Sequence, residues 1–426
     1  MKESRCLRGV VSVNTREFDP SMKKWIKQNV LVQIGMAFMV SGCAEDQHQE
    51  LAQMTKLDTI RKQFEESGLP AAYMIGVNLK TSKQISLSYG YSENGDDIFR
   101  IASMTKIITA VAALQLVEQG KVDLDESLHE WLPEMFKIPI LGNDGQTYRS
   151  DKPISLRQLL THTAGFGYGF SSQALDHYLN QADSDSSPDE VLTWVRVAEP
   201  GATYCYGTNM DWVGRLVEKV SGQSLEQYFR DHVTGPLGMD STWFNPPETL
   251  HDRIVAYRVR KADQFELEKP RVPERTTFYS GGGGLLSSAR DYLKLLTCLY
   301  REGEFGGTRI LKETTVKTMF QDHLPKHISP GFMDAPADHP RVTDGGFDRD
   351  LRNDRWGLSW ALEGENPDGL RSEGTAYWAG VFNSYYTLDR KQGVVVIYYS
   401  QFLPFSDPDA YGLYRAFERE VYLQTK

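Results

Sequence analysis

Apolar residues near the start of the chain recur first at helical and then at strand-like spacing. The helical positions, which fall on one face, are Leu51, Met54, Leu57, Ile60 and Phe64. Two strand-like runs follow at 72–79 and 85–91, and a short polar turn separates them. The pattern therefore predicts an amphipathic helix followed by a β-hairpin.

The end of the chain repeats these elements in the opposite order. Strand-like runs cover 381–388 and 394–400 on either side of a polar turn. A helical face then follows at Leu413, Tyr414, Phe417 and Val421. The middle of the chain, roughly 120–290, is richer in helical pattern and in long polar loops. We therefore predict an α/β (α+β) fold, in which one antiparallel sheet is built from both chain ends, flanked by the terminal helices, and interrupted by a helical subdomain.

A helix predicted at 103–119 is apolar on nearly all sides, which is typical of a helix buried inside a protein. Ser103 begins this helix, where free N–H groups and the helix dipole favour a developing negative charge. Lys106 comes three positions later and therefore lies on the same face, one turn away. In a dry setting its ammonium form is disfavoured, so the amine can accept a proton from Ser103. The pattern predicts a serine nucleophile activated by a lysine.

The Ser-x-x-Lys spacing is a weak signal when it is considered alone, because Ser21 and Lys24 match it too. The structural alternative is that Ser103 caps the helix and Lys106 is a surface charge. We favour the catalytic interpretation because the helix after Lys106 has no polar face for a charge to occupy. The same spacing is a signature of β-lactamases and penicillin-binding proteins.

Composition and charge limit the classes of function. The chain has 426 residues, of which 40% are hydrophobic and 11% aromatic, enough to bury a large core. Its formal net charge of −10 argues against nucleic acid as a partner and favours a small-molecule ligand. The four cysteines form no Cys-x-x-Cys pair, and the histidines show no convincing metal-binding spacing. We expect no disulfide framework, no metal and no cofactor, and the pattern leaves the oligomeric state open.

The first fifty residues carry the features of an export signal rather than of a folded domain. Three lysines at 23–27 precede an apolar stretch at 30–40, which has the length of a signal-peptide core. The four residues that end at Cys43 resemble a bacterial lipobox, in which the cysteine is lipidated. We expect translation to start at Met22 and residues 1–43 to be an upstream extension and signal peptide. Residues 44–426 would then form the enzyme, in the bacterial periplasm or anchored to a membrane through Cys43.

Five blocks of sequence resemble the class C β-lactamase-like serine hydrolase superfamily, in the family's order. They lie at 99–134 around Ser-Met-Thr-Lys, at 154–169 with Leu-Leu-Thr-His-Thr-Ala-Gly, at 199–225 with Tyr-Cys-Tyr, at 281–296 with Gly-Gly-Gly-Gly, and at 378–380 with Trp-Ala-Gly. Together they cover most of the predicted mature chain. The resemblance implies the same antiparallel sheet with flanking helices and a helical subdomain.

The resemblance also implies roles for residues outside the helix. Tyr206 matches the family's Tyr-x-Asn tyrosine, which works with the lysine in moving protons to the leaving group. The third residue of that motif is Thr208 here, and Asn209 comes one place late, which puts the asparagine role in doubt. The structural alternative for Tyr206 is that it packs a loop together with Tyr204.

The last block carries information about the substrate. Classical β-lactamases have Lys-Thr-Gly where this chain has Trp378, Ala379 and Gly380, and Trp-x-Gly resembles the family VIII carboxylesterases. Gly380 would let the strand approach the substrate, and the N–H groups of Val381 and Ser103 would form an oxyanion hole. We expect a substrate-binding strand at 378–381 and a small ester as substrate.

Four other functions remain open at this point. Within the superfamily the alternatives are a β-lactamase, a D-Ala-D-Ala peptidase, or an acyltransferase, which resolves the same acyl-enzyme with an alcohol or amine. From another class, the chain would be a non-enzymatic binding lipoprotein, although a binding module has no need of Ser103, Lys106 and Tyr206 together. An α/β-hydrolase elbow is not present, because the nearest match, at 357–361, ends in Ala361 instead of glycine.

Overall fold

The computed structural model describes residues 56–426, except for 182–194, 263, 269, 332–338, 344–346, 348–349 and 365–368. The chain divides into two compact units, 1–52 and 53–426, and only the second is described below. The predicted signal segment, Cys43 and the first two positions of the predicted helical face lie outside the described residues. The rest of that face lies on a helix at 56–67.

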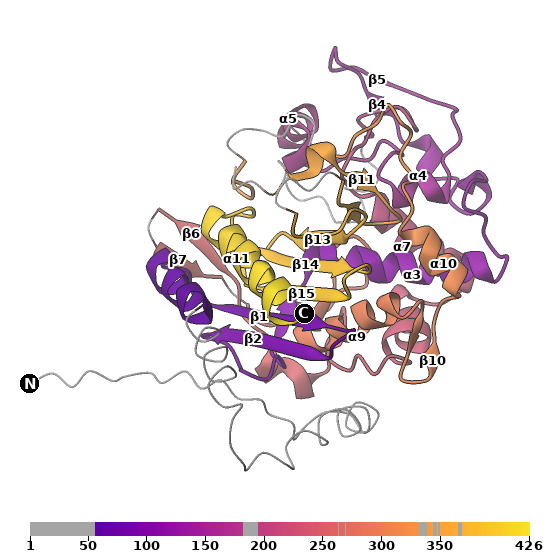
Figure 1. Ribbon diagram of the computed structural model, residues 1–426. Helices are drawn as coiled ribbons and strands as arrows, with labels where there is room; N and C mark the ends of the chain where they lie inside the picture. Colours follow the sequence, from indigo (N-terminus) through magenta and orange to yellow (C-terminus); the bar gives the residue numbers. More distant parts are fainter. Residues whose placement is uncertain are drawn as a thin grey trace, which may run out of the picture. The chain divides into compact units, whose positions relative to one another are not determined.

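A seven-stranded antiparallel sheet joins the two ends of the unit (Figure 1). Its strand order is β11-β12-β13-β14-β15-β1-β2, so β1, near the start, pairs directly with β15, near the end. The strands are β1 Ala72–Asn78, β2 Lys83–Tyr89, β11 Arg355–Trp356, β12 Ala361–Leu362, β13 Ala376–Gly380, β14 Ser384–Asp389 and β15 Val394–Tyr399. The prediction of one antiparallel sheet from both chain ends is confirmed.

The remaining elements lie around this sheet and in the middle of the chain. The helices are α3 Thr105–Glu118, α4 Leu156–Leu160, α5 Gln173–Gln181, α7 Asn209–Ser221, α8 Leu225–Phe229, α9 Ala289–Tyr300, α10 Glu313–Met319 and α11 Pro408–Gln424. Smaller sheets pair β3 Ile98–Arg100 with β8 Leu286–Ser288, β4 Ile140–Leu141 with β5 Thr147–Tyr148, β9 Glu304–Phe305 with β10 Thr308–Arg309, and β6 Arg258–Lys261 with β7 Gln264–Leu267 and β16 Phe402–Leu403.

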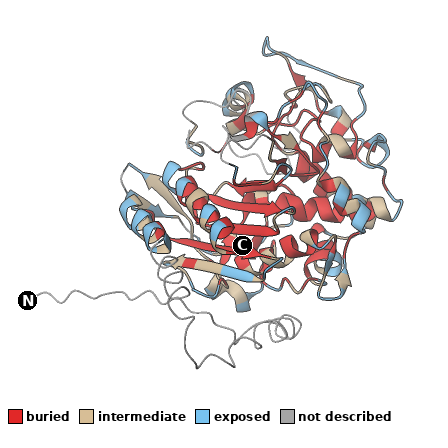
Figure 2. Ribbon diagram, viewed as in Figure 1, coloured by how far each residue is buried: buried red, intermediate tan, exposed pale blue. Residues whose placement is uncertain are grey.

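Helices cover both faces of the central sheet, and neighbouring residues of β14 point to opposite sides. The ring of Tyr385 stacks on Tyr414 of α11 at 5.0 Å, whereas Tyr386 meets Tyr292 of α9 at 5.5 Å. Gly76 of β1 leaves room for α11, since a Cβ there would lie 2.1 Å from a methyl group of Val421. The inner strands β1, β13, β14 and β15 are therefore wholly buried, whereas the edge strand β2 is partly exposed (Figure 2).

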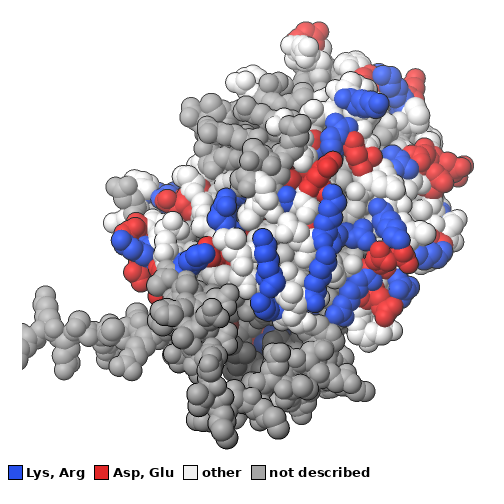
Figure 3. Space-filling model, viewed as in Figure 1, with Lys and Arg blue, Asp and Glu red and all other residues white. Residues whose placement is uncertain are grey.

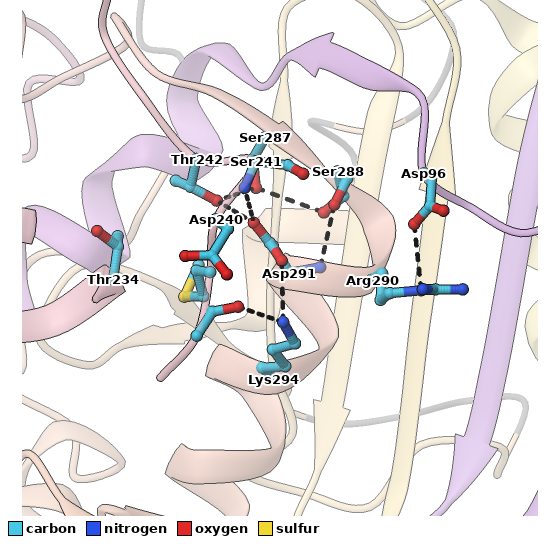
Figure 4. Close-up of polar contacts among 12 residues, drawn as sticks. Asp96, Thr234, Asp240, Ser241, Thr242, Ser287, Ser288, Arg290, Asp291 and Lys294 are labelled. Atoms are coloured by element: carbon cyan, nitrogen blue, oxygen red, sulfur yellow. Dashed lines mark hydrogen bonds and ion pairs between the residues drawn. The ribbon is translucent and has the colours of Figure 1, made fainter. Parts of the chain in front are cut away.

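The short pair β3–β8 connects two segments that are far apart in sequence. Strand β3 leads into Ser103, and β8 follows the glycine-rich run at 281–284. The start of α9, directly after β8, is fixed by Asp291, whose carboxylate accepts the N–H of Ser241 at 2.7 Å and the hydroxyl of Thr242 at 3.0 Å (Figure 4). The glycine-rich run is tied directly to the segment that carries Ser103, because the N–H of Ile101 donates to the carbonyl oxygen of Leu285 at 3.0 Å and the hydroxyl of Thr109 donates to that of Gly281 at 2.7 Å.

Charged side chains of both signs are interspersed over the described surface that Figure 3 shows. Several form ion pairs, such as Arg157 with Asp125 at 2.6 Å and Arg355 with Asp322 at 2.6 Å. Within the described residues, every helix is too short or too polar to cross a bilayer.

Candidate active site

Ser103 lies at the entrance to the central buried helix, as its spacing predicts. It belongs to a single 3₁₀ turn, Ala102–Met104, which precedes α3 instead of forming its first residue. Ala102 has a φ of 42°, in the left-handed region that alanine rarely adopts. Strain of this kind just before a candidate nucleophile is typical of a functional turn.

Lys106 is buried and its amine touches Ser103 directly. The Nζ atom lies 3.0 Å from the Oγ of Ser103, 2.6 Å from the carbonyl oxygen of Gly282 and 3.4 Å from the hydroxyl of Tyr168. Only 1% of Lys106 is exposed, and the twelve residues from Thr105 to Leu116 are all buried. The helix therefore gives the amine a dry setting, in contact with a hydroxyl that it can deprotonate.

Tyr206 faces the same amine from the loop before α7. Its ring centroid lies 4.8 Å from Lys106 Nζ, and its hydroxyl accepts a hydrogen bond of 3.0 Å from the indole N–H of Trp378. Only 4% of Tyr206 is exposed. The structure thus brings together a serine, a lysine, a tyrosine and a tryptophan from three separate parts of the chain.

Strand β13 runs directly beside the turn that carries Ser103. A Cβ on Gly380 would lie 2.5 Å from the carbonyl oxygen of Ile101, so this close approach requires glycine. Trp378 and Ala379 are buried in the strand, and Val381 follows at its end, half-buried. That the N–H groups of Val381 and Ser103 form an oxyanion hole stays a prediction.

The displaced asparagine of the Tyr-x-Asn motif has a structural place. Asn209 is fully buried, and its amide donates to the carbonyl oxygens of Phe166 at 2.9 Å and Cys205 at 3.0 Å. The residue at the family's asparagine position, Thr208, is half-buried at the start of α7. Asn209 therefore holds two loops together, while the family's position in the motif carries a hydroxyl.

His162, in the Leu-Leu-Thr-His block, lies beneath Tyr206. The two ring centroids are 4.8 Å apart, and the Nδ1 of His162 lies 3.0 Å from the amide of Asn209. Burial, and then the charge of Lys106, lower the pKa of His162 well below its ordinary range. The imidazole is therefore neutral, and it packs the tyrosine without adding a second cation.

Two residues that sequence reasoning missed complete the surroundings of Lys106. The carboxylate of Asp211, in α7, accepts the hydroxyl of Ser280 at 2.5 Å and the N–H of Gly282 at 3.1 Å. Its other neighbour is the hydroxyl of Tyr168, since both groups lie against Gly282. One signal was available in the sequence: Asp211 stands between apolar residues at the start of a helix, where a carboxylate is rarely buried without a partner.

Burial dominates the electrostatics of this pair. Burial raises the pKa of Asp211, and the hydrogen bond from Ser280 and the charge of Lys106 oppose that rise. Burial, followed by the negative charge of Asp211, raises the pKa of Tyr168 well above its ordinary range. Tyr168 is therefore a neutral phenol throughout the range in which an enzyme works.

Comparisons with known proteins agree with this geometry. Residues 58–419 match the family described as Beta-lactamase. The chain is 32% identical over 347 residues to the Monacolin J acid methylbutanoyltransferase of Aspergillus terreus, covering 76% of this chain and 82% of that protein. It is 30% identical over 323 residues to the Lovastatin esterase of Penicillium rubens, covering 70% and 78%.

A solved structure shows the same fold. The LovD6 mutant of simvastatin synthase (LovD) from Aspergillus terreus matches with a TM-score of 0.77 at 28% identity, over 92% of this chain and 99% of that one. The names of these relatives include an esterase, an acyl-group transferase and a synthase.

Proposed function

Since the chain belongs to the β-lactamase family, with relatives among hydrolases and acyltransferases, we propose that it is a carboxylesterase acting on small carboxylic esters through an acyl-enzyme on Ser103. The resemblance to β-lactamase-like serine hydrolases is confirmed by the family match, whereas the choice of ester as substrate is our inference from the site. Ser103, Lys106 and Tyr206 supply the chemistry.

The proposed reaction needs one proton relay. Lys106 takes the proton of Ser103 as the Oγ attacks the ester carbonyl, and the N–H groups of Ser103 and Val381 stabilise the resulting oxyanion. When the C–O bond of the ester breaks, the Tyr206 hydroxyl delivers a proton to the leaving alkoxide and recovers one from Lys106. Water then attacks the acyl-enzyme with the same groups acting in reverse, and the carboxylic acid leaves.

The observation that carries the choice of an ester is the contact between Trp378 and Tyr206. The polar atom of Trp378 donates to the Tyr206 hydroxyl at 3.0 Å, so the strand position that is lysine in classical β-lactamases orients the tyrosine here. A cation that recognises the carboxylate of a β-lactam is worth about 1.5–3 kcal/mol, or roughly one to two orders of magnitude. Its replacement by an indole favours an uncharged substrate.

Acyl transfer is the second candidate, and the relatives support it. The relative at 32% identity is named a methylbutanoyltransferase. Hydrolysis and transfer share the acyl-enzyme and differ only in whether water or an alcohol attacks it. We place hydrolysis first because it needs no acceptor site beyond the residues already described.

A substrate panel tests the proposal. The measurement is kcat/KM for p-nitrophenyl acetate and butyrate against nitrocefin and benzylpenicillin, with Ser103→Ala as the control. We expect the esters to be at least tenfold better substrates and the control to be inactive. A β-lactam that is tenfold better than the esters would replace the esterase with a β-lactamase or peptidase.

An added alcohol distinguishes the two outcomes of the acyl-enzyme. With p-nitrophenyl butyrate as donor, butyric acid should be the main product even when a primary alcohol is present. A butyrate ester as the dominant product would make the chain an acyltransferase.

We further propose that the enzyme is exported and held at a membrane by a lipid on Cys43, as its lipobox-like sequence predicts. Expression of the full gene should then give a membrane-bound protein, and Cys43→Ala should release it or block its processing. Stable anchoring requires more than one acyl chain. An unprocessed protein that begins at Met1 and stays in the cytoplasm would contradict this proposal.

A further inference from the structure

The amine of Lys106 must present a lone pair to Ser103 if it is to accept the serine proton. A neutral amine has two hydrogens and one lone pair, so both hydrogens must be directed elsewhere. The carbonyl oxygen of Gly282 lies 2.6 Å from Nζ and accepts one of them. The oxygen of Tyr168, at 3.4 Å, lies where it can accept the other. The lone pair then remains for Ser103, at 3.0 Å.

Both of these acceptors are held by one carboxylate. Asp211 accepts the N–H of Gly282 at 3.1 Å, which fixes the peptide whose carbonyl faces Lys106. The hydroxyl of Tyr168 lies against Gly282 beside the same carboxylate and can donate its hydrogen there, so the phenol oxygen is left to act as an acceptor toward Lys106. The hydroxyl of Ser280, at 2.5 Å, completes the coordination of the carboxylate.

The packing around these groups is tight. A Cβ on Gly282 would lie 2.5 Å from the carboxylate of Asp211 and 2.9 Å from the hydroxyl of Tyr168. Asp211 is 5% exposed and Lys106 is 1% exposed, so bulk water does not supply alternative partners. The carboxylate, the phenol and the glycine peptide form a single support behind the amine.

We propose that Asp211 is a positioning residue, which acts through Tyr168 and Gly282 to turn the lone pair of Lys106 toward Ser103. This inference rests on the proposed function, because it assigns a role within the same proton relay. The hydrogen bonds of Asp211 go to Ser280 and Gly282 and none goes to Ser103. Its effect is on the orientation of the amine and on the balance between its neutral and ammonium forms.

Within the described residues, four titratable groups face Lys106. They are Tyr168 and His162 from the block at 154–169, Tyr206 from the loop before α7, and Asp211 from α7. Tyr168 and His162 stay neutral, as argued above. Asp211 is therefore the group whose negative charge stabilises the ammonium form of Lys106.

Asp211→Asn tests this role with almost no change of shape. The amide oxygen of the asparagine still accepts the hydrogen bonds from Gly282 and Ser280. Its NH₂ group, however, donates to the oxygen of Tyr168 and turns the phenol hydrogen toward Lys106. That hydrogen then competes with the hydroxyl of Ser103 for the lone pair of the amine. With p-nitrophenyl butyrate we expect kcat to fall about 10–100-fold with little change in KM. Loss of the negative charge should move the acidic limb of the kcat/KM profile to lower pH, by about one unit.

Asp291→Asn is a matched control. Asp291 is also a buried aspartate that accepts from a backbone N–H and a hydroxyl, but its lysine partner is Lys294, at 3.2 Å, on its own helix (Figure 4). We expect this variant to be destabilised while its pH profile stays that of the wild type. A shift in Asp211→Asn that the control lacks cannot come from general loss of stability.

Tyr168→Phe provides a second route to the same result if Asp211→Asn does not fold. Removing the phenol leaves the charge of Asp211 less compensated, so the acidic limb should move to higher pH, and kcat should fall by about tenfold or more. In the double variant Asp211→Asn/Tyr168→Phe, the loss of activity should be smaller than the two single losses combined, because both residues act on the same amine. An unshifted limb in Asp211→Asn, or in Tyr168→Phe if only that variant folds, overturns the proposal. Activity that survives Ser103→Ala would instead refute the proposed function itself.

Discussion

Two buried cations in this protein sit in opposite surroundings. Arg371, just before β13, donates to Glu418 of α11 at 2.9 Å and to Glu363 at 2.9 Å, and its guanidinium also contacts the hydroxyl of Tyr414 at 3.0 Å. Lys106, in α3, has a carbonyl and two hydroxyls around its amine and forms no ion pair within the described part of the chain. Both side chains are almost wholly buried.

The two surroundings correspond to two roles: the charge of Arg371 stabilises the fold, whereas the amine of Lys106 can exchange a proton. An arginine between two carboxylates keeps its charge at every relevant pH, so this cluster ties α11 to the sheet and offers no chemistry. A lysine whose amine touches only neutral dipoles has no fixed counter-ion in contact, so the amine can exchange a proton with Ser103. Asp211 lies one hydrogen bond further away, close enough to orient the amine without pairing with it.

The largest expected effect comes from Lys106→Met, which removes the mobile proton. Activity on p-nitrophenyl butyrate should fall by about 10²–10⁴-fold. The melting temperature should stay the same or rise, because the variant no longer buries an amine without a carboxylate partner. Steady-state kinetics and thermal unfolding of the same preparation check both parts. Activity within tenfold of the wild type would show that Lys106 is not the base.

The reverse outcome is expected for Arg371→Met. This variant leaves Glu418, which is 0% exposed, with Arg415 at 2.7 Å as its one cationic partner within the described part of the chain. Breaking a buried pair in this way costs about 3–5 kcal/mol of stability. The kcat of the protein that remains folded should be close to that of the wild type. A variant that keeps its stability but loses its activity would remove the distinction between the two cations.

Trp378→Phe sharpens the comparison at the site itself. An aromatic ring remains at this position, but the indole N–H that donates to Tyr206 is lost. The loss of this one hydrogen bond should lower kcat by up to about tenfold. The preference for esters over benzylpenicillin should persist, since phenylalanine adds no cation. If the variant gained activity on penicillins and kept its activity on esters, Trp378 would select the substrate by size rather than orient Tyr206.

The smallest effect concerns Asp354, a buried carboxyl close enough to Arg371 and Glu363 to feel their charges. Burial raises its pKa to about 7, against a lowering by the hydrogen bond from Tyr377. Because the native state holds this proton more tightly than the unfolded chain, stability is lost as the pH rises from about 4 to about 7. Asp354→Asn should not show this loss. The melting temperature of the variant, relative to that of the wild type, should therefore rise between about pH 4 and about pH 7. Parallel curves for the two proteins would show that Asp354 titrates normally.

The sequence predicted the site where its residues are close in the chain or lie in a recognisable block. Ser103 and Lys106 are three positions apart on one helix, so their contact at 3.0 Å follows from helical geometry. The strands also followed from their alternation, although β2 and β14 begin two residues earlier and three residues later than predicted. The 3₁₀ turn at Ser103 was missed, because the left-handed φ of Ala102 leaves no mark in residue type.

The support behind Lys106 could not be predicted in the same way. Gly282 is 176 residues away along the chain and reaches the amine only because β8 pairs with β3. Tyr168, from a loop, and Asp211, from α7, meet there through tertiary packing that leaves no periodic signal in the sequence. Asn209 was noted only as a residue out of place, and its structural role became apparent from the carbonyl oxygens that it binds.

Trapping the acyl-enzyme tests the central claim most directly. The full chain is mixed with excess p-nitrophenyl butyrate, quenched in acid after a short interval, and digested with trypsin, which releases Ser103 in the peptide 101–106. We predict a burst of p-nitrophenolate that approaches one equivalent per enzyme, and a butyryl group that fragmentation of this peptide assigns to Ser103. Lys106→Met should show neither. A butyryl group on another residue, or turnover with a burst and label that persist in Ser103→Ala, would contradict the account.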